Sequence, residues 1–394
     1  MTFNEKLKTR LQNLKQQSLY RSRRLIQTAQ DVTLNVDGHS LINFCSNDYL
    51  GLANHSEVKQ AFKNAVDTYG VGSGASQLVT GHQKPHHALE EELAEFLGRE
   101  RVLLFSTGYM ANLGVVSALT ERHDEVFEDK LNHASLIDAA LLSRATLTRF
   151  PHNNIDDLFL KLKKSRANTK LVISDGVFSM DGDKADLNAL IKTSNENDAV
   201  LMIDDAHGIG TLGENGRGII DELDISESNL PILVGTFGKA FGTFGAFVAG
   251  SNELIETLIN LSRSYIYTTA MPAAVAEATR ASLKLIRNGA QRRESLQARI
   301  TQFREGCNQL GIMVTPKPRY GNHSAIQPII VGEAEQALQL SDSLQKQGLL
   351  ISAIRPPTVP QNTSRLRITF SANHTTDHVE KLLSALDNAV LSNK

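Results

Sequence analysis

Apolar residues near the N-terminus recur at helical spacing, at Phe3, Leu7, Leu11 and Leu14. Basic residues fill the other face, so we expect an amphipathic helix whose apolar side packs on its own domain. The next stretch, VTLNVDGHSLINFCS (32–46), alternates apolar and polar residues around Asp37 and Gly38. An Asp-Gly pair between alternating runs is typical of a tight turn, so the pattern predicts a β-hairpin.

The middle of the chain, from about residue 51 to 285, alternates short apolar runs with longer helical patterns. The apolar runs are RVLLFSTG, KLVISDG, AVLMIDDAHG, PILVGTFG and GAFVAG, and helical patterns such as HHALEEELAEFLG lie between some of them. Runs that are apolar throughout are typical of strands buried on both faces. The order predicts an α/β domain with a mostly parallel central sheet and helices on both faces, and ligands bind beyond the carboxyl ends of such strands.

From about residue 286 the pattern changes. A long charged helical stretch, RRESLQARITQFREGCNQLG, is followed by apolar runs and helices in mixed order, which predicts a smaller α+β domain. We therefore expect three parts: an N-terminal arm of helix and hairpin (1–50), a large α/β domain (51–285) and a small C-terminal α+β domain (286–394).

Composition excludes several classes of function. Of 394 residues 41% are hydrophobic, which suffices for a sizeable core, and 41 basic against 43 acidic residues leave no excess charge for nucleic acid or a membrane surface. Cys45 and Cys307 make no disulfide framework, and no run approaches the roughly 18 apolar residues of a membrane span. We expect a cytoplasmic protein; an organelle transit segment is the alternative reading of the amphipathic start.

Three segments resemble known binding motifs, but their neighbouring residues do not suit the binding that each motif predicts. HGIGTLG satisfies the GxGxxG nucleotide fingerprint after an apolar run, but ENGRGIID follows where a helix should open, so we expect no dinucleotide binding. Gly238-Lys239 lacks the Ser or Thr of a Walker A loop. One histidine cluster has partly helical spacing but no accompanying set of carboxylates or cysteines, so we expect no metal site there: His82, His86 and His87.

Polar residues at the ends of the apolar runs form a stronger pattern. Ser106 to Tyr109 open a helical stretch, where free backbone amides suit a phosphate, although an ordinary helix cap explains them equally well. Asp204 and His207 stand at the end of another such run, AVLMIDDAHG; a carboxylate there can hold a heterocyclic nitrogen protonated and the histidine can bond a phenolic oxygen, with turn acids as the alternative. Lys239 lies between glycines in GTFGKAFGTFG and is a candidate for a lowered pKa and Schiff-base chemistry, against the alternative of a loop lysine.

The chain resembles the α-oxoamine synthase family of fold-type-I enzymes that depend on pyridoxal 5'-phosphate (PLP). The motifs run from residue 43 to 369: NFCSNDYLGL, GVGSGASQLVTG, HHALEEELAEFLG, LNHASLIDAA, SDGVFSMDGD, MIDDAHGIG, TFGKAFGTFGA and RLRIT. TFGKAFG, YIYTTAMP and AIRPPTVP most resemble the biotin-pathway branch of that family. The resemblance implies a fold-type-I PLP-dependent transferase, bound PLP, and a homodimer with its sites at the interface.

The resemblance also implies roles. Lys239 matches the lysine that carries PLP as a Schiff base and then serves as general base and acid at the substrate Cα. Asp204 matches the acid paired with the pyridine nitrogen, His133 the histidine over the ring and beside the substrate, and His207 the one near the 3'-oxygen. Other positions match cofactor contacts, the last two reaching the phosphate of the neighbouring subunit: Gly108, Tyr109, Ser179, Thr236 and Thr268 or Thr269.

For the amino-acid substrate, Arg365 and Arg367 alternate with apolar residues, so both guanidinium groups share one face of a strand. One of them can clamp a carboxylate, and by resemblance we choose Arg367. Arg21 and Thr358 match further substrate contacts of the family. Arg21 has neighbouring arginines, and a solvated basic patch explains it as well.

The activity that the resemblance implies is a decarboxylative condensation of L-alanine with pimeloyl-CoA, or with the pimeloyl-acyl carrier protein, giving 8-amino-7-oxononanoate for biotin. A sibling activity, such as glycine C-acetyltransferase or an aminoketone synthase, would use the same residues with a different acyl pocket. A non-catalytic PLP-fold binding module and a nicotinamide oxidoreductase are the remaining alternatives.

Overall fold

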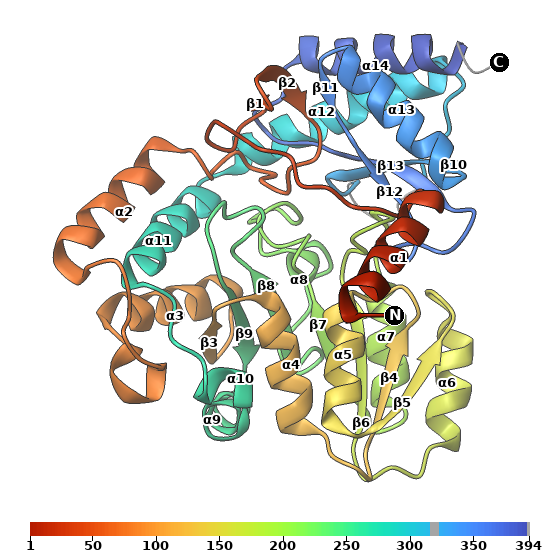
Figure 1. The fold of residues 1–394 in the computed structure, drawn as a ribbon. Helices are drawn as coiled ribbons and strands as arrows, with labels where there is room; N and C mark the ends of the chain where they lie inside the picture. The colour runs from red at the N-terminus through yellow and green to blue at the C-terminus, as the bar shows by residue number, and fades with distance from the viewer. Residues whose placement is uncertain (316–322, 392–394) are drawn as a thin grey trace.

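The computed structural model describes residues 1–315 and 323–391, and its centre is a sheet of seven strands (Figure 1). The strand order across the sheet is β3 (Arg101–Phe105), β9 (Ala246–Gly250), β8 (Ile232–Thr236), β7 (Val200–Asp204), β6 (Lys170–Asp175), β4 (Glu125–Asp129) and β5 (Thr146–Phe150). Only β9 runs antiparallel to its neighbours in this sheet. The predicted mostly parallel sheet is therefore confirmed.

Helices cover both faces of this sheet, as predicted. One face carries α4 (Gly108–Leu119), α5 (Ala134–Ser143), α9 (Asn252–Leu261) and α10 (Arg263–Ile266). The other face packs against α3 (Lys84–Leu97), α6 (Ile155–Lys164), α7 (Leu187–Asn195), α8 (Ile219–Glu222) and α11 (Ala273–Arg287). Val172 of β6 faces the second layer and its neighbour Ile173 the first, which is why this strand is apolar at consecutive positions.

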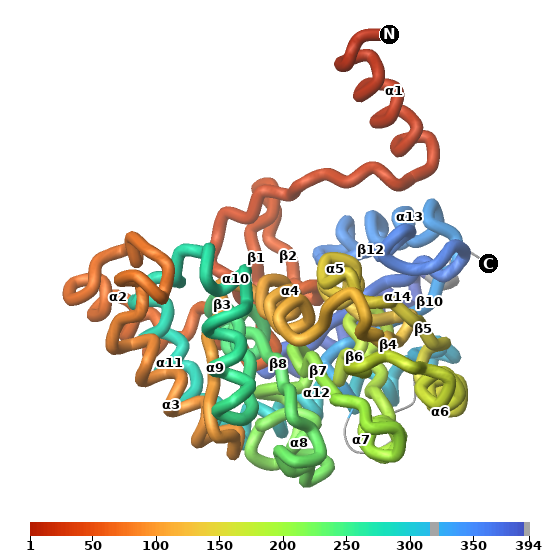
Figure 2. Tube along the Cα trace, turned by 90° about the horizontal axis from the view of Figure 1, so that it is seen from below, coloured from red at the N-terminus to blue at the C-terminus, as the bar shows by residue number. Residues whose placement is uncertain are grey.

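The N-terminal helix α1 (Phe3–Gln16) forms where the sequence predicts it and begins with a capping box between Thr2 and Glu5. Its packing differs from the expectation. The helix stands away from the rest of the chain (Figure 2), and none of its residues is buried; Phe3 is 75% exposed and Leu11 47%. The spacing of apolar residues predicts the helix but carries no information on what covers its apolar side.

The predicted hairpin is present as β1 (Thr33–Val36) and β2 (His39–Asn43), with positive φ angles at Asp37 and Gly38 in the turn. A third strand, β11 (Leu349–Leu350), pairs parallel with β2. The hairpin of the predicted arm thus shares a sheet with the predicted C-terminal domain. The boundaries at residues 50 and 285 stay a prediction.

The C-terminal part is built around an antiparallel sheet in the order β10 (Ile326–Gly332), β13 (Ser364–Thr369), β12 (Ser352–Ile354). Three helices accompany it: α12 (Ala290–Gln309), α13 (Ala334–Lys346) and α14 (Thr376–Leu391). The remaining elements, α2 (Ser56–Tyr69) and the short π-helix η1 (Gln77–Gly81), precede α3. In the described ranges no helix has both the length and the apolar character that crossing a membrane requires.

Candidate active site

A cavity of about 180 Å³ lies beyond the carboxyl ends of β6, β7 and β8, where the α/β pattern places a site. Eight of the residues proposed from the sequence line it: Gly108, Tyr109, His133, Ser179, Asp204, His207, Thr236 and Lys239. Four residues that the sequence analysis did not propose complete the lining: Asn112, Ser135, Asp175 and Ala206. The fold therefore brings together residues that are up to 131 positions apart in the sequence.

Lys239 reaches the cavity from the turn that follows β8. This turn packs so closely on the loop at Ala53 that only glycine fits at position 242. A Cβ at Gly242, where φ is +64°, would lie 2.3 Å from the backbone nitrogen of Ala53. Burial lowers the pKa of Lys239 to about 8, although the carboxyls of Asp204 and Asp175 oppose the shift. A large fraction of an amine with this pKa is neutral near pH 8, which is the form that attacks a carbonyl carbon.

A chain of hydrogen bonds between side chains links Lys239 to Arg367, which lies beside the cavity. Lys239 Nζ lies 2.9 Å from His207 Nε2, and His207 Nδ1 lies 2.7 Å from the hydroxyl of Tyr49. The Tyr49 hydroxyl donates to Asn47 Oδ1 at 3.0 Å. Because that hydroxyl has one proton, His207 must donate through Nδ1 and accept from Lys239 through Nε2. Burial lowers the pKa of His207 well below its usual value, in agreement with this neutral form.

The far end of this chain is Arg367 on β13, whose Nη1 and Nη2 both donate to Asn47 Oδ1 at 3.2 Å. Its Nε donates to the carbonyl oxygen of Ser179 at 2.7 Å. Arg365 lies on the same face of the strand, as predicted, but pairs with the carboxylate of Asp181. Arg367 is therefore the arginine of the two whose side chain has no carboxylate partner among the described residues.

Asp204 ends β7 at the cavity and is 7% exposed. Asn112 Nδ2 donates to its Oδ2 at 2.7 Å, and the amide of Ala206 donates to its Oδ1 at 3.0 Å. These two donors fix the orientation of the carboxylate. Beside it, burial raises the pKa of Asp175 well above its usual value, and the Asp204 carboxyl adds to the shift.

Two helix N-termini border the cavity. His133 is the N-cap of α5, and its Nδ1 accepts from the backbone amide of Ser135 at 3.3 Å. Thr107 caps α4 through the amide of Met110, so the helix-cap reading of this segment is correct. The first amides of α4, including that of Gly108, have no partner within the helix and remain suited to an anion.

Five proposed residues lie outside the lining of this cavity; one is Arg367, which adjoins it through its bond to the carbonyl oxygen of Ser179. Thr269 pairs with Ser76 in an isolated bridge, and Thr268 precedes it. Arg21 Nη2 donates to Thr358 Oγ1 at 3.3 Å, so these two proposed substrate contacts, 337 residues apart, do meet. Their roles stay predictions.

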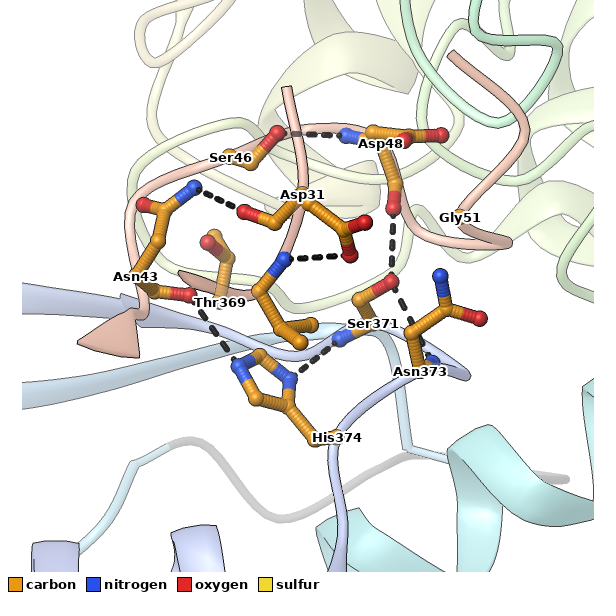
Figure 3. Close-up of a pocket in the computed structure, with 10 residues that line it drawn as sticks. Asp31, Asn43, Ser46, Asp48, Gly51, Thr369, Ser371, Asn373 and His374 are labelled. Carbon is orange, nitrogen blue, oxygen red and sulfur yellow. Dashed lines mark hydrogen bonds between the residues drawn. The ribbon is translucent and has the colours of Figure 1, made fainter. Parts of the chain in front are cut away.

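The loop from residue 44 to 51 carries the two linking residues that the sequence analysis did not single out, Asn47 and Tyr49. A small polar hollow, shown in Figure 3, lies where this loop meets the C-terminal part; its volume of about 10 Å³ is close to that of one water. Ser371 Oγ donates to the carbonyl oxygen of Asp48 at 2.9 Å, and His374 Nε2 donates to that of Asn43 at 3.0 Å. These bonds hold the loop in place.

Two of the motifs set aside from the sequence adjoin the cavity, since HGIGTLG begins with His207 and Gly238 precedes Lys239. No helix begins at the third glycine of HGIGTLG, since α8 starts only at Ile219. His86 caps α3 and bonds the carbonyl oxygen of Met271, whereas His82, His87 and Glu90 could hold a metal by spacing alone. Two of these three are exposed and lie close to a helix N-terminus, where the helix dipole opposes a cation.

The side chains around the cavity fit PLP. Lys239 offers an amine for its aldehyde, Asp204 a fixed carboxylate for its ring nitrogen, and the N-terminus of α4 amides for its phosphate. Gly108 leaves that end open: a Cβ there would lie 3.9 Å from Thr236 Cβ.

Comparison with known proteins agrees with this geometry. The family model of class I and II aminotransferases matches residues 39–386. An 8-amino-7-oxononanoate synthase from Saccharophagus degradans is 54% identical over 388 residues, which cover 98% of this chain and 96% of that protein.

Two solved structures extend the comparison. A serine palmitoyltransferase from S. paucimobilis, solved with PLP and myriocin, superimposes with a TM-score of 0.93 at 28% identity, covering 100% of this chain and 99% of its own. An 8-amino-7-oxononanoate synthase from Francisella tularensis gives 0.78 at 34% identity, covering 90% and 98%. The chain belongs to the class I and II aminotransferase family, in its branch of 8-amino-7-oxononanoate synthases.

Proposed function

We propose that this protein condenses L-alanine with a pimeloyl thioester, with loss of CO2 and a free thiol, to give 8-amino-7-oxononanoate in biotin synthesis. The observation that carries the proposal is the cavity itself, which is lined by an amine of lowered pKa and a fixed carboxylate. A chain of hydrogen bonds joins that amine to an arginine without a carboxylate partner beside the cavity. Relatives at 54% identity over nearly the whole chain bear the name of that activity.

The cofactor is PLP, which when bound withdraws electrons from the substrate Cα and so makes its proton removable. Lys239 would hold PLP through its amine, and a pKa of about 8 suits a group that accepts and returns the Cα proton. Asp204 holds a proton at the ring nitrogen. His207 lies within hydrogen-bond distance of the Lys239 amine and, being neutral, accepts from it. His133 lines the cavity beside them.

Binding of the amino-acid substrate is assigned to Arg367. Arg367 binds the carboxylate of alanine, because its guanidinium is held by Asn47 and Ser179 rather than neutralised by an acid. Ser179, Gly108, Tyr109 and Thr236 contact the cofactor. Arg21 and Thr358 contact the acyl substrate.

The protein acts as a cytoplasmic homodimer, with Thr268 or Thr269 of one subunit at the cofactor phosphate of the other. Thr269 is exposed in the single chain, and so are several large apolar side chains in that region, Tyr267, Leu78 and Val79 among them. An interface would bury them. Sedimentation of the PLP-loaded protein measures this state directly.

Thiol release by the purified, PLP-loaded protein tests the activity. We expect release with pimeloyl-CoA plus L-alanine, and none when either is omitted. Release only with acetyl-CoA plus glycine would leave Lys239 and PLP in place but move the protein to a sibling activity. The pimeloyl-acyl carrier protein, used in a parallel assay, identifies the preferred thioester.

A further inference from the structure

A small hairpin that carries Ser179 of the cavity lining supports the neighbouring Arg367. It follows β6, and its two sides meet in a bridge between Val177 and Lys184. Its tip, residues 179–181, contacts both arginines of β13: Ser179 accepts from Arg367 at 2.7 Å, and Asp181 pairs with Arg365. The position of this hairpin, together with Asn47, therefore sets where the Arg367 guanidinium lies.

The base of the hairpin is held by His152, which lies outside the cavity. His152 Nε2 lies 2.7 Å from Asp183 Oδ2, and Nδ1 lies 3.0 Å from Asp129 Oδ1 at the end of β4. The imidazole also packs edge-on against Phe178 at 4.4 Å between ring centroids. Asp183 and Phe178 are joined by a backbone hydrogen bond of 2.9 Å, so His152 contacts both sides of the turn.

Both ring nitrogens of His152 face carboxylates. A carboxylate accepts hydrogen bonds, so both nitrogens must donate, and only the imidazolium can do so. The three side chains are largely enclosed: His152 is 27% exposed, Asp129 1% and Asp183 15%. Burial opposes the charge of His152, but the two carboxylates outweigh it and raise its pKa to about 10.

We propose that His152 is a positioning residue of the amino-acid site: its imidazolium ties the hairpin 177–184 to the end of β4 and thereby holds Arg367 where it binds the substrate carboxylate. The inference rests on the proposed function. A neutral imidazole at position 152 donates to one carboxylate only, and the amide of a glutamine there brings no positive charge to compensate the two partly buried carboxylates. The hairpin then keeps its connection to β6 and its contacts with Asn153, but loses the charged link between Asp183 and Asp129.

The test compares three variants as PLP-loaded protein. His152→Gln and Asp183→Asn break the link from its two ends, and neither residue lines the cavity. Asn154→Ala is the matched control, because it removes only the N-cap of α6, two residues from His152. The readouts are the affinity for L-alanine alone by calorimetry, the KM values for both substrates, kcat, and the melting temperature.

We expect His152→Gln and Asp183→Asn to weaken alanine binding about ten-fold, with the KM for alanine rising in parallel and that for the thioester within about two-fold of wild type. Asn154→Ala lowers the melting temperature without weakening alanine binding. The inference is overturned if either link variant binds alanine like wild type, or if the control weakens binding equally. Failure of the wild type to bind alanine would instead contradict the proposed function.

Discussion

The candidate site has two parts that are built differently: a sheet wall that lines the cavity, and an arginine wall that adjoins it at Ser179. The sheet wall carries Lys239, His207 and Asp204, each within three residues of the end of β7 or β8. The arginine wall carries Arg367, which is fixed by Asn47 and Ser179, residues 320 and 188 positions away. The first wall is a product of local sequence and sheet order, and the second depends on long-range contacts.

This difference predicts that the sheet wall determines the chemical step and the arginine wall determines substrate affinity. Groups at strand ends are fixed by the most buried elements of the fold, which suits chemistry that needs a proton at one atom. The arginine wall rests on the loop 44–51 and the hairpin 177–184, so changes there should alter substrate affinity before they alter chemistry. Substitutions on the two walls should therefore separate kcat from KM.

The largest effect is expected on the sheet wall. Lys239→Ala removes both the attachment point of PLP and the group that moves the Cα proton, so turnover should fall at least about 10⁴-fold. The rate of thiol release measures this loss. As a check, borohydride reduction should attach PLP covalently to the wild-type protein but not to the variant. Turnover at the wild-type rate in the variant would contradict the assignment of Lys239.

The sheet wall could be predicted from the sequence because strand ends in a parallel sheet meet at one edge. Apolar runs ending in Asp204 and in Gly238-Lys239 place their side chains there without any knowledge of strand order. The arginine wall could be predicted only in part. The alternation around Arg367 places it on a strand face, but Arg365 shares that face, and only the pairing with Asp181 separates them.

A second large effect is expected on the arginine wall. Arg367→Ala removes the charged donor for the substrate carboxylate, so the KM for alanine should rise about 100-fold while kcat falls less. Steady-state kinetics with alanine varied at saturating thioester measure the split. Arg299→Ala, which loses a bond to Thr376 outside the cavity, is the control and should behave like wild type. An unchanged KM in the Arg367 variant would exclude it as the carboxylate clamp.

Tyr49 and Asn47 were missed because their signal is weak in the sequence. Both stand in NFCSNDYLGL, where an Asn and a Tyr before a buried stretch are read as turn and core residues. Their function follows from contacts with His207 and Arg367, which lie 158 and 320 residues away. The exposed side of α1 shows the same limit, since a pattern of apolar residues specifies an element and leaves its partner open.

A smaller effect is expected where the walls are joined. Tyr49→Phe keeps the ring but removes the hydroxyl between His207 and Asn47, leaving a buried imidazole N–H without an acceptor. We expect a loss of about 1 to 3 kcal/mol in the free energy of unfolding and a fall in kcat of about ten-fold. Denaturant titration and kinetics measure the two. Full activity together with full stability would show that the walls work independently.

The last prediction concerns pH and the residue that anchors the arginine wall. An unfolded chain titrates histidine near pH 6.5, whereas pairing raises the pKa of His152 to about 10 in the fold. The folded state therefore holds the extra proton between these values, so the contribution of His152 is complete below about pH 6.5 and is lost as pH rises through 10. The stability difference between wild type and His152→Gln should shrink from pH 7 to 9.5, by at most about 1.4 kcal/mol per pH unit. Because the two proteins differ only at position 152, groups far from it cancel in this difference. A difference that stays constant would mean that the imidazole is neutral and that its two carboxylates do not bind it as a cation.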